Sequence, residues 1–290
     1  MLIIFNPIAG GTRRRRLARA LRALRGAGAR VELAETTHPG HARVIAAEAA
    51  GRGVALVVAA GGDGTVAEVA AGVNGSGAAL GLLPLGTANV LAHELGLPLA
   101  PGRAAAVLLQ ARQVALHPGL ARWPDGTERL FVQMISAGFD AAVVHGLDPA
   151  EKRRLGRAAY LLESVRQLRR YRFGGFSATM DGGPALPATS VIISKGRFYA
   201  GAYRALPGAS PLRPGFSVLR FADAGPAGAV WAGLSLPLHA LNRAPGAVLD
   251  RADHIRLHGD GVPCQADGDA AGGLPCEVRD APHPISFLVP

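Results

Sequence analysis

The stretch Gly61–Thr65, with the sequence GGDGT, is the feature that most constrains the fold of this chain. It follows an apolar run at 54–60, which predicts a fully buried strand, and it precedes residues 66–73, which predict a helix. Glycines at such a corner let the backbone turn sharply and approach a ligand closely. The helix then offers unpaired N–H groups and the positive end of its dipole to an anion, most naturally a phosphate.

Asp63 gives this turn a second property. A carboxylate would be repelled by a bare phosphate, so its presence predicts a bridging Mg²⁺ or a hydroxyl group to be held. Asp63 is therefore a candidate metal ligand and a candidate catalytic residue. The simpler interpretation is a tight strand-to-helix turn in which the Asp is only a cap.

Strands and helices alternate as far as about residue 116, which predicts a parallel sheet with right-handed crossovers. Ligands on such sheets bind outside the carboxyl ends of the strands. Two further strands, 2–5 and 79–84, run into comparable turns at Asn6–Gly11 and Leu85–Asn89. The sequence therefore predicts that these turns and GGDGT meet at one edge of the sheet. The remaining elements expected here are a strand at 31–35, helices at 41–50 and 66–73, and a first helix with Leu17, Leu21 and Leu24 on its buried face.

The character of the chain changes after residue 117, where short β-like runs separated by turns predict an antiparallel domain. These runs are 129–135, 175–180, 189–195, 216–221, 254–258 and 285–289. One helix is expected from about 149 to 171. Its predicted packing face is formed by Leu155, Ala159, Leu162, Val165 and Leu168, and its charges by Lys152, Arg153, Arg154, Arg157, Arg166, Arg169 and Arg170. The basic side is either a solvated face or a surface that docks onto anionic lipid headgroups. Trp123 and Trp231 are expected to pack inside this domain.

Composition narrows the class of protein and of partner. The net charge of +10 favours anionic partners, but an aromatic content of 5% and the lack of a recognition motif argue against nucleic acid. Cys264 and Cys276 are too few for a disulfide framework, and we expect them to be free thiols. No signal peptide or apolar run long enough to span a membrane is evident, which predicts a cytoplasmic protein. The sequence is compatible with a homodimer but does not specify the oligomeric state.

The ordered motifs resemble those of the diacylglycerol kinase catalytic family, and the bacterial lipid kinases of that family in particular. The resemblance extends over nearly the whole chain. The residues that carry it are Asn6-Pro7 with Gly10-Gly11, Gly61–Thr65 with Glu68, Pro84–Asn89, Ser136–Asp140, Leu155–Tyr160 and Asp267–Asp269.

This resemblance implies a two-domain fold, similar to that of NAD kinases. It consists of an α/β nucleotide-binding domain with a parallel sheet at 1–117, a C-terminal antiparallel β-sandwich at 118–280 with the basic helix at 149–171, and residues 281–290 returning to the first domain. It also implies ATP and Mg²⁺ as cofactors, a lipid such as diacylglycerol as acceptor, and an active site between the domains. By residue match, the ATP-binding positions are Asn6, Thr36, Gly61, Gly62, Asp63, Gly64, Thr65, Val66, Ala67 and Thr87, and the base that takes the proton of the lipid hydroxyl is Asp269.

The chain departs from the pattern of the family at three positions. Asp269 stands where the family usually has Glu, and Val90 stands where many relatives have an active-site Asp. Pro214, within Leu212–Gly215, replaces an Asp of a structural metal site, which argues against a structural Mg²⁺ there.

The leading hypothesis is an ATP-dependent lipid kinase that works at a membrane surface with peripheral attachment. Two alternatives stay open at this point. An NAD kinase shares a GGDGT turn and a two-domain plan, although the turns at Asn6-Pro7 and Gly86–Asn89 favour the lipid kinase. A nucleotide or lipid sensor without catalytic activity would account for Val90 and Pro214.

Overall fold

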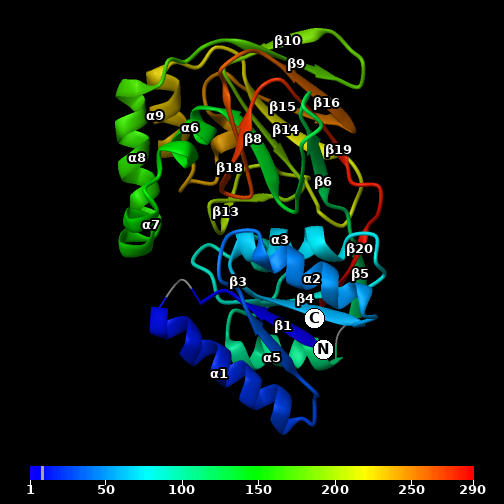
Figure 1. Ribbon diagram of the computed structural model, residues 1–290. Helices are drawn as coiled ribbons and strands as arrows, with labels where there is room; N and C mark the ends of the chain where they lie inside the picture. Colours follow the sequence, from blue (N-terminus) through cyan, green and yellow to red (C-terminus); the bar gives the residue numbers. More distant parts are fainter. Residues whose placement is uncertain (8–9, 111) are drawn as a thin grey trace. The chain divides into compact units, whose positions relative to one another are not determined.

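The computed structural model describes residues 1–7, 10–110 and 112–290. The chain forms two units (Figure 1). The first unit comprises Met1–Pro118 together with Pro282–Pro290, and the second comprises Gly119–Ala281. Pro282–Pro290, at the end of the sequence, therefore belong to the same unit as Met1–Pro118.

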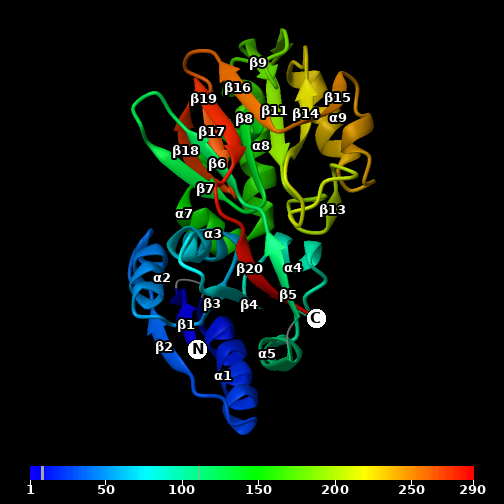
Figure 2. The same cartoon turned by 90° about the vertical axis from the view of Figure 1, so that its right-hand side faces the viewer.

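The first unit contains a six-stranded sheet in the order β2-β1-β3-β4-β20-β5. The first four of these strands are parallel, and β20 is parallel to β4 but antiparallel to β5. Figure 2 shows β20, the last strand of the chain, within this sheet. The strands are β1 (Leu2–Phe5), β2 (Glu32–Glu35), β3 (Leu56–Gly61), β4 (Ala79–Pro84), β5 (Arg112–Leu116) and β20 (Ile285–Val289).

Helices cover both faces of this sheet (Figure 1). On one face α1 and α5 pack on the sheet, and the predicted stripe Leu17, Leu21 and Leu24 of α1 is buried there. On the other face α2 and α3 pack against each other, and Gly72 permits this approach because a Cβ there would lie 2.5 Å from the carbonyl oxygen of Arg43. The helices are α1 (Gly10–Gly26), α2 (His41–Gly51), α3 (Asp63–Val73), α4 (Val90–Glu94) and α5 (Pro101–Gln110).

The second unit is built on two six-stranded antiparallel sheets. Their orders are β10-β9-β16-β19-β6-β7 and β15-β14-β11-β8-β17-β18. The strands are β6 (Gly119–Arg122), β7 (Glu128–Phe131), β8 (Met134–Gly138), β9 (Phe176–Met180), β10 (Ala185–Ala188), β11 (Ser190–Ser194), β14 (Phe216–Phe221), β15 (Ala247–Ala252), β16 (His254–His258), β17 (Pro263–Ala266), β18 (Asp269–Gly273) and β19 (Cys276–Asp280), with a small ribbon of β12 (Phe198–Tyr199) and β13 (Tyr203–Arg204). The fold class predicted from the sequence, α/β followed by an antiparallel sandwich, is confirmed.

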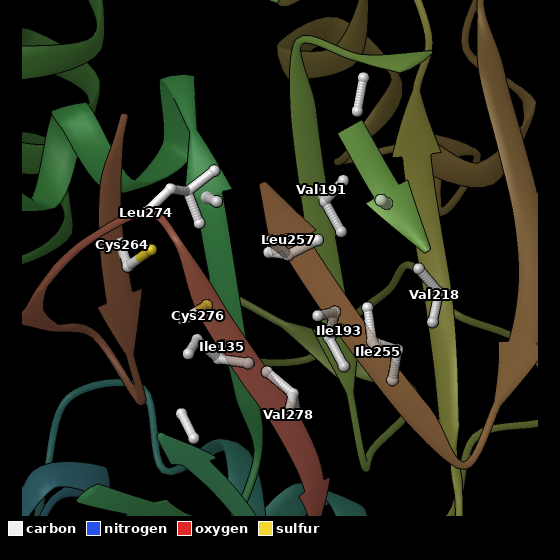
Figure 3. Close-up of a cluster of buried hydrophobic side chains, with 14 of the residues drawn as sticks. Ile135, Val191, Ile193, Val218, Ile255, Leu257, Cys264, Leu274, Cys276 and Val278 are labelled. Atoms are coloured by element: carbon white, nitrogen blue, oxygen red, sulfur yellow. The ribbon is translucent and has the colours of Figure 1, made fainter. Parts of the chain in front are cut away.

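The core of the second unit lies between its two sheets (Figure 3). Alternation along β11 shows how it forms, because Val191 and Ile193 are in this core while Ile192 packs in a second cluster. Cys264 and Cys276 come from different sheets and are both buried free thiols, as expected. Their mutual hydrogen bond, together with burial, raises the pKa of the Cys264 thiol.

Three predicted segments differ from the structure. The run 129–135 is divided between β7 and β8, because the intervening N–H groups of Val132 and Gln133 donate to Asp267 instead of to a neighbouring strand. The run 285–289 belongs to the first sheet and not to the antiparallel domain. The helix expected at 149–171 is two helices, α7 (Pro149–Leu155) and α8 (Arg157–Arg170), separated by Gly156 at a positive φ of 58°.

The packing of α8 also differs from the prediction. Ala159 and Glu163 are its buried residues, whereas Leu162 and Val165, expected to pack, are exposed. The reason lies on α6 (Phe139–Gly146), where Gly146 leaves room for the Glu163 carboxylate; a Cβ at Gly146 would lie 2.2 Å from Glu163 Oε1. A side chain with hydrogen-bonding capacity thus occupies the place where a leucine was expected.

The two tryptophans have different environments. Trp123 packs against the sandwich core and donates Nε1–H to the carbonyl of Gly273 at 2.9 Å, as expected for a packed residue. Trp231 lies on α9 (Pro226–Ser235) with 57% of its surface exposed, so the prediction that it packs inside the domain is wrong. Within the described ranges, no helix is both long enough and apolar enough to cross a membrane.

Candidate nucleotide and phosphoryl-transfer site

The GGDGT turn joins β3 to α3 at the carboxyl edge of the parallel strands. Gly61 ends β3 and α3 begins at Asp63, three residues earlier than predicted. A Cβ on Gly61 would lie 2.4 Å from Thr65 Oγ1, so no other residue fits this position without displacing the helix. The turn is therefore tight because Thr65 folds back over it.

The turn after β4 lies directly against GGDGT. A Cβ on Gly86 would lie 2.4 Å from the Cα of Gly62, and the N–H groups of Leu85 and Gly86 donate to the carbonyl of Gly61 at 2.9 and 3.0 Å. Asn89 adopts a left-handed conformation with φ 48° and donates Nδ2–H to the carbonyl of Gly86 at 2.8 Å. Two turns predicted separately from the sequence thus form one continuous backbone surface.

The ends of β1 and β2 supply polar side chains to the same edge. The N–H of Asn6 donates to the carbonyl of Ala60 at 3.3 Å, and the N–H of Thr36 donates to that of Phe5 at 2.9 Å. Asn6 Nδ2 lies 3.5 Å from Thr65 Oγ1, at the limit of a hydrogen bond. Asn6, Thr36 and Thr65 therefore lie along adjacent strand ends, as expected from the parallel sheet. Ile8 and Ala9 of the predicted turn Asn6–Gly11 lie outside the described residues.

The other predicted ATP-binding residues differ in accessibility. Thr87 is exposed and Gly64 is half-buried. Val66 and Ala67 are buried in α3, with 1% and 3% of their surface exposed, so their side chains cannot contact a ligand. The N–H of Val66 already donates to the carbonyl of Gly62.

Asp63 connects GGDGT to the helix after β4. Its Oδ1 accepts the N–H of Leu91 at 3.3 Å, near the start of α4. Burial raises the pKa of Asp63, while the backbone N–H groups around the start of α4 act in the opposite direction. Asp63 therefore helps to hold the two glycine turns together whatever else it binds.

The residues around Asp63 determine how Mg²⁺ could be held. No group of three or more His, Cys, Asp or Glu side chains in residues 1–7, 10–110 and 112–290 is arranged to hold a metal ion by itself. Mg²⁺ in kinases is commonly bound through one or two carboxylates and the phosphates of the substrate, with water completing the shell. A single carboxylate in the glycine turn fits that mode of binding, and it does not fit a metal site made of protein side chains alone.

Glu68, on the second turn of α3, stabilises the loop that follows Thr36. Its two carboxylate oxygens accept the N–H groups of Gly40 at 2.9 Å and Ala42 at 3.0 Å, which caps the N-terminus of α2. The sequence places Glu68 in the motif but gives no sign of this partner, which is 26–28 residues away.

In the second unit, the segment Gln265–Asp269 forms a turn that the Asp267 side chain attaches to the backbone between β7 and β8. The Asp267 carboxylate accepts the N–H groups of Val132, Gln133 and Met134 at 2.7, 2.9 and 3.0 Å. Asp267 itself has a positive φ of 50°. It lies in the turn between β17 and β18, and its carboxylate bonds the backbone between β7 and β8.

Asp269 begins β18 and presents an exposed carboxylate with cations near it. Its Oδ2 lies 3.6 Å from Nη2 of Arg129, and 48% of its side-chain surface is exposed. Lys152 reaches the same turn, since its Nζ lies 3.5 Å from the carbonyl oxygen of Gly268 and 5.5 Å from the ring centre of Tyr160. Burial lowers the pKa of Lys152, but Tyr160 and the Asp269 charge outweigh it and leave the pKa raised. Sequence reasoning did not anticipate that Arg129 and Lys152 would accompany the candidate base.

Asp140, from the Ser136–Asp140 motif, anchors this turn from the other side. Its carboxylate accepts hydrogen bonds from the hydroxyls of Ser136 and Tyr199 and from Gln265 Nε2. Gln265 Oε1 in turn accepts the N–H of Gly268 at 2.8 Å. Burial and the Asp140 charge raise the pKa of Tyr199, which keeps its hydroxyl a donor. Gln265 therefore links the Asp140 carboxylate to the backbone N–H of Gly268, next to Asp269.

Comparison with known proteins shows what the first unit is similar to. A family model of the diacylglycerol kinase catalytic domain matches residues 1–121. This part of the chain is therefore similar to the diacylglycerol kinase catalytic domain. The matched residues contain GGDGT, the turn after β4 and the strands that carry them.

Relatives extend the likeness beyond the catalytic domain. A probable YegS-like lipid kinase of Pseudomonas aeruginosa is 38% identical over 149 residues, which is 50% of this chain and 47% of that protein. The chain thus spans about half the length of this relative. A diacylglycerol kinase of Mycobacterium tuberculosis is 26% identical over 86% of this chain and 81% of its own length. The family model and these relatives carry the names of lipid kinases or diacylglycerol kinases.

The likeness in fold covers both units. The crystal structure of a diacylglycerol kinase from Bacillus anthracis has a TM-score of 0.72 to this chain at 17% identity, covering 100% of this chain and 96% of that one. At this identity the comparison establishes the fold alone.

One departure from the diacylglycerol kinase pattern has a structural explanation. The backbone around Pro214 is held by Lys195, whose Nζ donates to the carbonyl oxygens of Arg213 at 3.2 Å and Gly215 at 2.8 Å and to Asp280 Oδ1 at 2.5 Å. Asp280 Oδ2 accepts the N–H of Gly215 at 2.6 Å. An internal ammonium therefore provides the positive charge that these oxygens require, in the segment where the sequence argued against a structural Mg²⁺.

Proposed function

We propose that this protein transfers the γ-phosphoryl group of ATP to a hydroxyl of a lipid acceptor such as diacylglycerol, at a membrane surface. The observation that carries the proposal is the pair of interlocked glycine turns, Gly61–Thr65 and Leu85–Asn89, in a domain similar to the diacylglycerol kinase catalytic domain. Such turns at the carboxyl ends of parallel strands let phosphates approach backbone N–H groups closely. The match to a diacylglycerol kinase over most of the chain supports a lipid as acceptor.

In this proposal the first unit binds and orients ATP. Asn6 and Thr87 offer polar groups at the strand ends, Thr36 is buried at the end of β2 beside them, and the first turn of α3 offers backbone N–H groups to the phosphates. Mg²⁺ bound with ATP would neutralise phosphate charge, and Asp63 would supply its protein carboxylate. Because phosphoryl transfer relies mainly on positioning and charge neutralisation, the rigidity of the interlocked turns matters as much as any single side chain.

Asp269 is the proposed general base. It would accept the proton of the lipid hydroxyl as that oxygen attacks the γ-phosphorus, with ADP as the leaving group. Its exposure supports this role, and so do Arg129 and Lys152, whose positive charges would attract phosphate oxygens. Asp140 and Gln265 would position the turn without touching the substrate.

The test is a transfer assay with γ-labelled ATP, Mg²⁺ and the purified protein. Separate vesicles would contain diacylglycerol, phosphatidylglycerol, a sphingoid base or monoacylglycerol, and a further sample would contain NAD without lipid. We expect label in the organic extract with diacylglycerol. Label in the aqueous product of the NAD sample would instead identify an NAD kinase. ATP binding without transfer to any acceptor would leave a sensor as the better explanation.

A further inference from the structure

Helix α9 is unusual because it is apolar and yet most of its surface is not packed against the rest of the protein. The helix has no charged residue and no buried residue. Only one side of it contacts the protein, where Ala232 and Leu236 are partly buried against the cluster around Ile192 and Leu219. Its one hydroxyl, on Ser235, donates to the carbonyl of Trp231 at 2.7 Å and so is satisfied within the helix.

The opposite side of this segment is a continuous apolar stripe, which we call the α9 apolar face. It consists of Val230, Trp231, Leu234 and Leu238, with 44%, 57%, 60% and 76% of their surfaces exposed. Val230, Trp231 and Leu234 lie on one side of α9 by their spacing, and Leu238 follows in the turn after the helix. Isolated exposed leucines need no explanation, but four large apolar side chains on one stripe indicate an interaction surface.

Cations border the α9 apolar face, and acidic residues are missing from its segment. Residues 224–249 contain no Asp or Glu. Arg243 is exposed on the short 3-10 helix Leu241–Arg243, which contacts α9. Exposed Arg204 is adjacent as well, because its N–H donates to Nδ1 of His239, the neighbour of Leu238. Helix α8, which contacts α9, contributes exposed Arg169 and Arg170 from its last turn (Figure 1).

We propose that the α9 apolar face is a docking surface for an anionic phospholipid bilayer, with Trp231 and Leu234 inserting at the level of the headgroups. An apolar stripe bordered by arginines, in a segment whose nearest carboxylates are those of Asp223 before it and Asp250 after it, matches the layered chemistry of such a surface, with acyl chains below anionic headgroups. Tryptophan favours this boundary because its ring is apolar and its N–H can stay hydrated. The neighbouring helix α8 exposes Leu161 and Val165 and would add to the contact.

This inference rests on the proposed function to the extent that a lipid acceptor resides in a bilayer. It adds a second attachment site, because the sequence predicted membrane attachment through the basic residues of α8 and not through α9. Cations alone would hold the protein above the headgroups, whereas burial of the α9 apolar face would make binding partly resistant to salt. Each buried leucine contributes through the area it removes from water.

The experiment uses the full chain without ATP. In Trp123→Phe, Trp231 is the only tryptophan, so its emission reports its surroundings directly. We expect a blue shift with vesicles of phosphatidylcholine and phosphatidylglycerol at 70:30, and quenching by lipids brominated near the headgroup. Sedimentation with the same vesicles should show partitioning that falls by on the order of tenfold in Leu234→Gln, Leu238→Gln. Val44→Gln, an exposed apolar residue of the first unit, is the matched control and should partition like the wild type.

Unshifted Trp231 emission together with unchanged partitioning of the double variant would overturn the proposal. A change in solution mass of the double variant, with unchanged vesicle binding, would overturn it too and make the face a contact between copies of this chain. Activity toward a water-soluble, short-chain diacylglycerol separates the two proposals. If it persists while vesicle binding ignores the α9 variants, the docking surface fails and the kinase stands. If no acceptor is phosphorylated while the variants abolish binding, the kinase fails and the docking surface stands.

Discussion

The Asp63 carboxylate accepts the backbone N–H of Leu91 at 3.3 Å, across 28 residues of sequence. This bond joins the GGDGT turn to the helix that follows the next strand, so the residue predicted to hold a metal also has a structural partner. A substitution of Asp63 therefore has to preserve the acceptor if it is to reveal chemistry and not merely loss of fold.

Asp63→Asn meets that requirement. The amide oxygen can still accept the Leu91 N–H, but the charge that would face Mg²⁺ is lost. We expect phosphoryl transfer at saturating ATP and Mg²⁺ to fall by at least on the order of a hundredfold, since charge neutralisation is central to this chemistry. Far-UV circular dichroism should be unchanged. A variant as active as the wild type would show that Asp63 is only a cap.

The stability of the same variant depends on pH in a defined direction. Burial raises the pKa of Asp63 above its unfolded value of about 4. Ionisation of such a group costs stability, in full above the folded pKa and not at all below the unfolded one. Thermal melts should therefore show Asp63→Asn gaining stability relative to wild type as the pH rises from 3 to 7. A relative loss over that range would mean that the N–H groups at α4 outweigh burial.

Asp269 is tested by a pair of substitutions. Asp269→Asn keeps the shape but cannot accept the proton, and general-base assistance contributes about a hundredfold to ten-thousandfold. We expect a loss of that size in kcat, with ATP affinity nearly unchanged. Asp269→Glu should retain activity, because Glu is the usual residue of the family this chain resembles. Wild-type turnover by the Asn variant would exclude Asp269 as the base.

The strands and glycine turns of the first unit could be predicted from the sequence for a physical reason. Parallel strands are buried on both faces, so 54–60 and 79–84 are uninterrupted apolar runs, and each ends in a glycine turn. The edge of the sheet on which these turns meet follows from the topology alone. What the sequence could not give was their contact, because the approach of Gly86 to Gly62 depends on how two loops pack in space.

The strand pairing and helix packing of the second unit were harder to predict from the sequence, because the contacts that determine them are polar or join residues distant in sequence. Strands β17 and β18 are short and consist largely of alanine, glycine and proline, which do not favour strands, and β17 pairs with β8 more than a hundred residues away. The inward side of α8 was assigned to leucines, yet Glu163 occupies it, since its charge is paired with Arg166 and it also accepts from Gln167. Hydrophobic periodicity cannot indicate a buried carboxylate whose partners lie on the same helix.

The basic helix gives a fourth prediction, restricted to two of its arginines. Arg166 is paired with Glu151 at 2.7 Å and with Glu163, so substituting it would also disturb α7 and α8. The side chains of Arg153 and Arg157 lie outside the described residues. Arg169 and Arg170 are exposed on the last turn, and each cation near an anionic membrane contributes about 1 kcal/mol.

Arg169→Gln, Arg170→Gln should therefore weaken partitioning onto anionic vesicles by roughly thirtyfold at low salt. The loss should shrink as salt rises, because these charges are screened. Arg22→Gln, Arg25→Gln on α1 removes the same charge from the first unit and serves as the control. ATP binding should be unaffected in both. Equal vesicle binding by the two double variants would mean that the basic side of α8 is only a solvated face.

The last prediction concerns Lys195, which is fully buried and bonded to Asp280 and to two backbone carbonyls. Burial lowers the pKa of Lys195 although Asp280 counteracts it, so the folded protein carries a costly internal charge that is retained by its three oxygen partners. Lys195→Met removes the charge but fills a similar volume. It leaves Asp280 Oδ1 and the carbonyls of Arg213 and Gly215 without the ammonium donor, and breaking a buried pair in this way costs about 3–5 kcal/mol. Urea unfolding followed by circular dichroism measures this cost.

If the ammonium substitutes for a structural metal, the melting temperature of the wild type should not change with EDTA, whereas Mg²⁺ should partly restore the stability of Lys195→Met. A wild type destabilised by EDTA, or a variant as stable as the wild type, would show that Lys195 does not have this role.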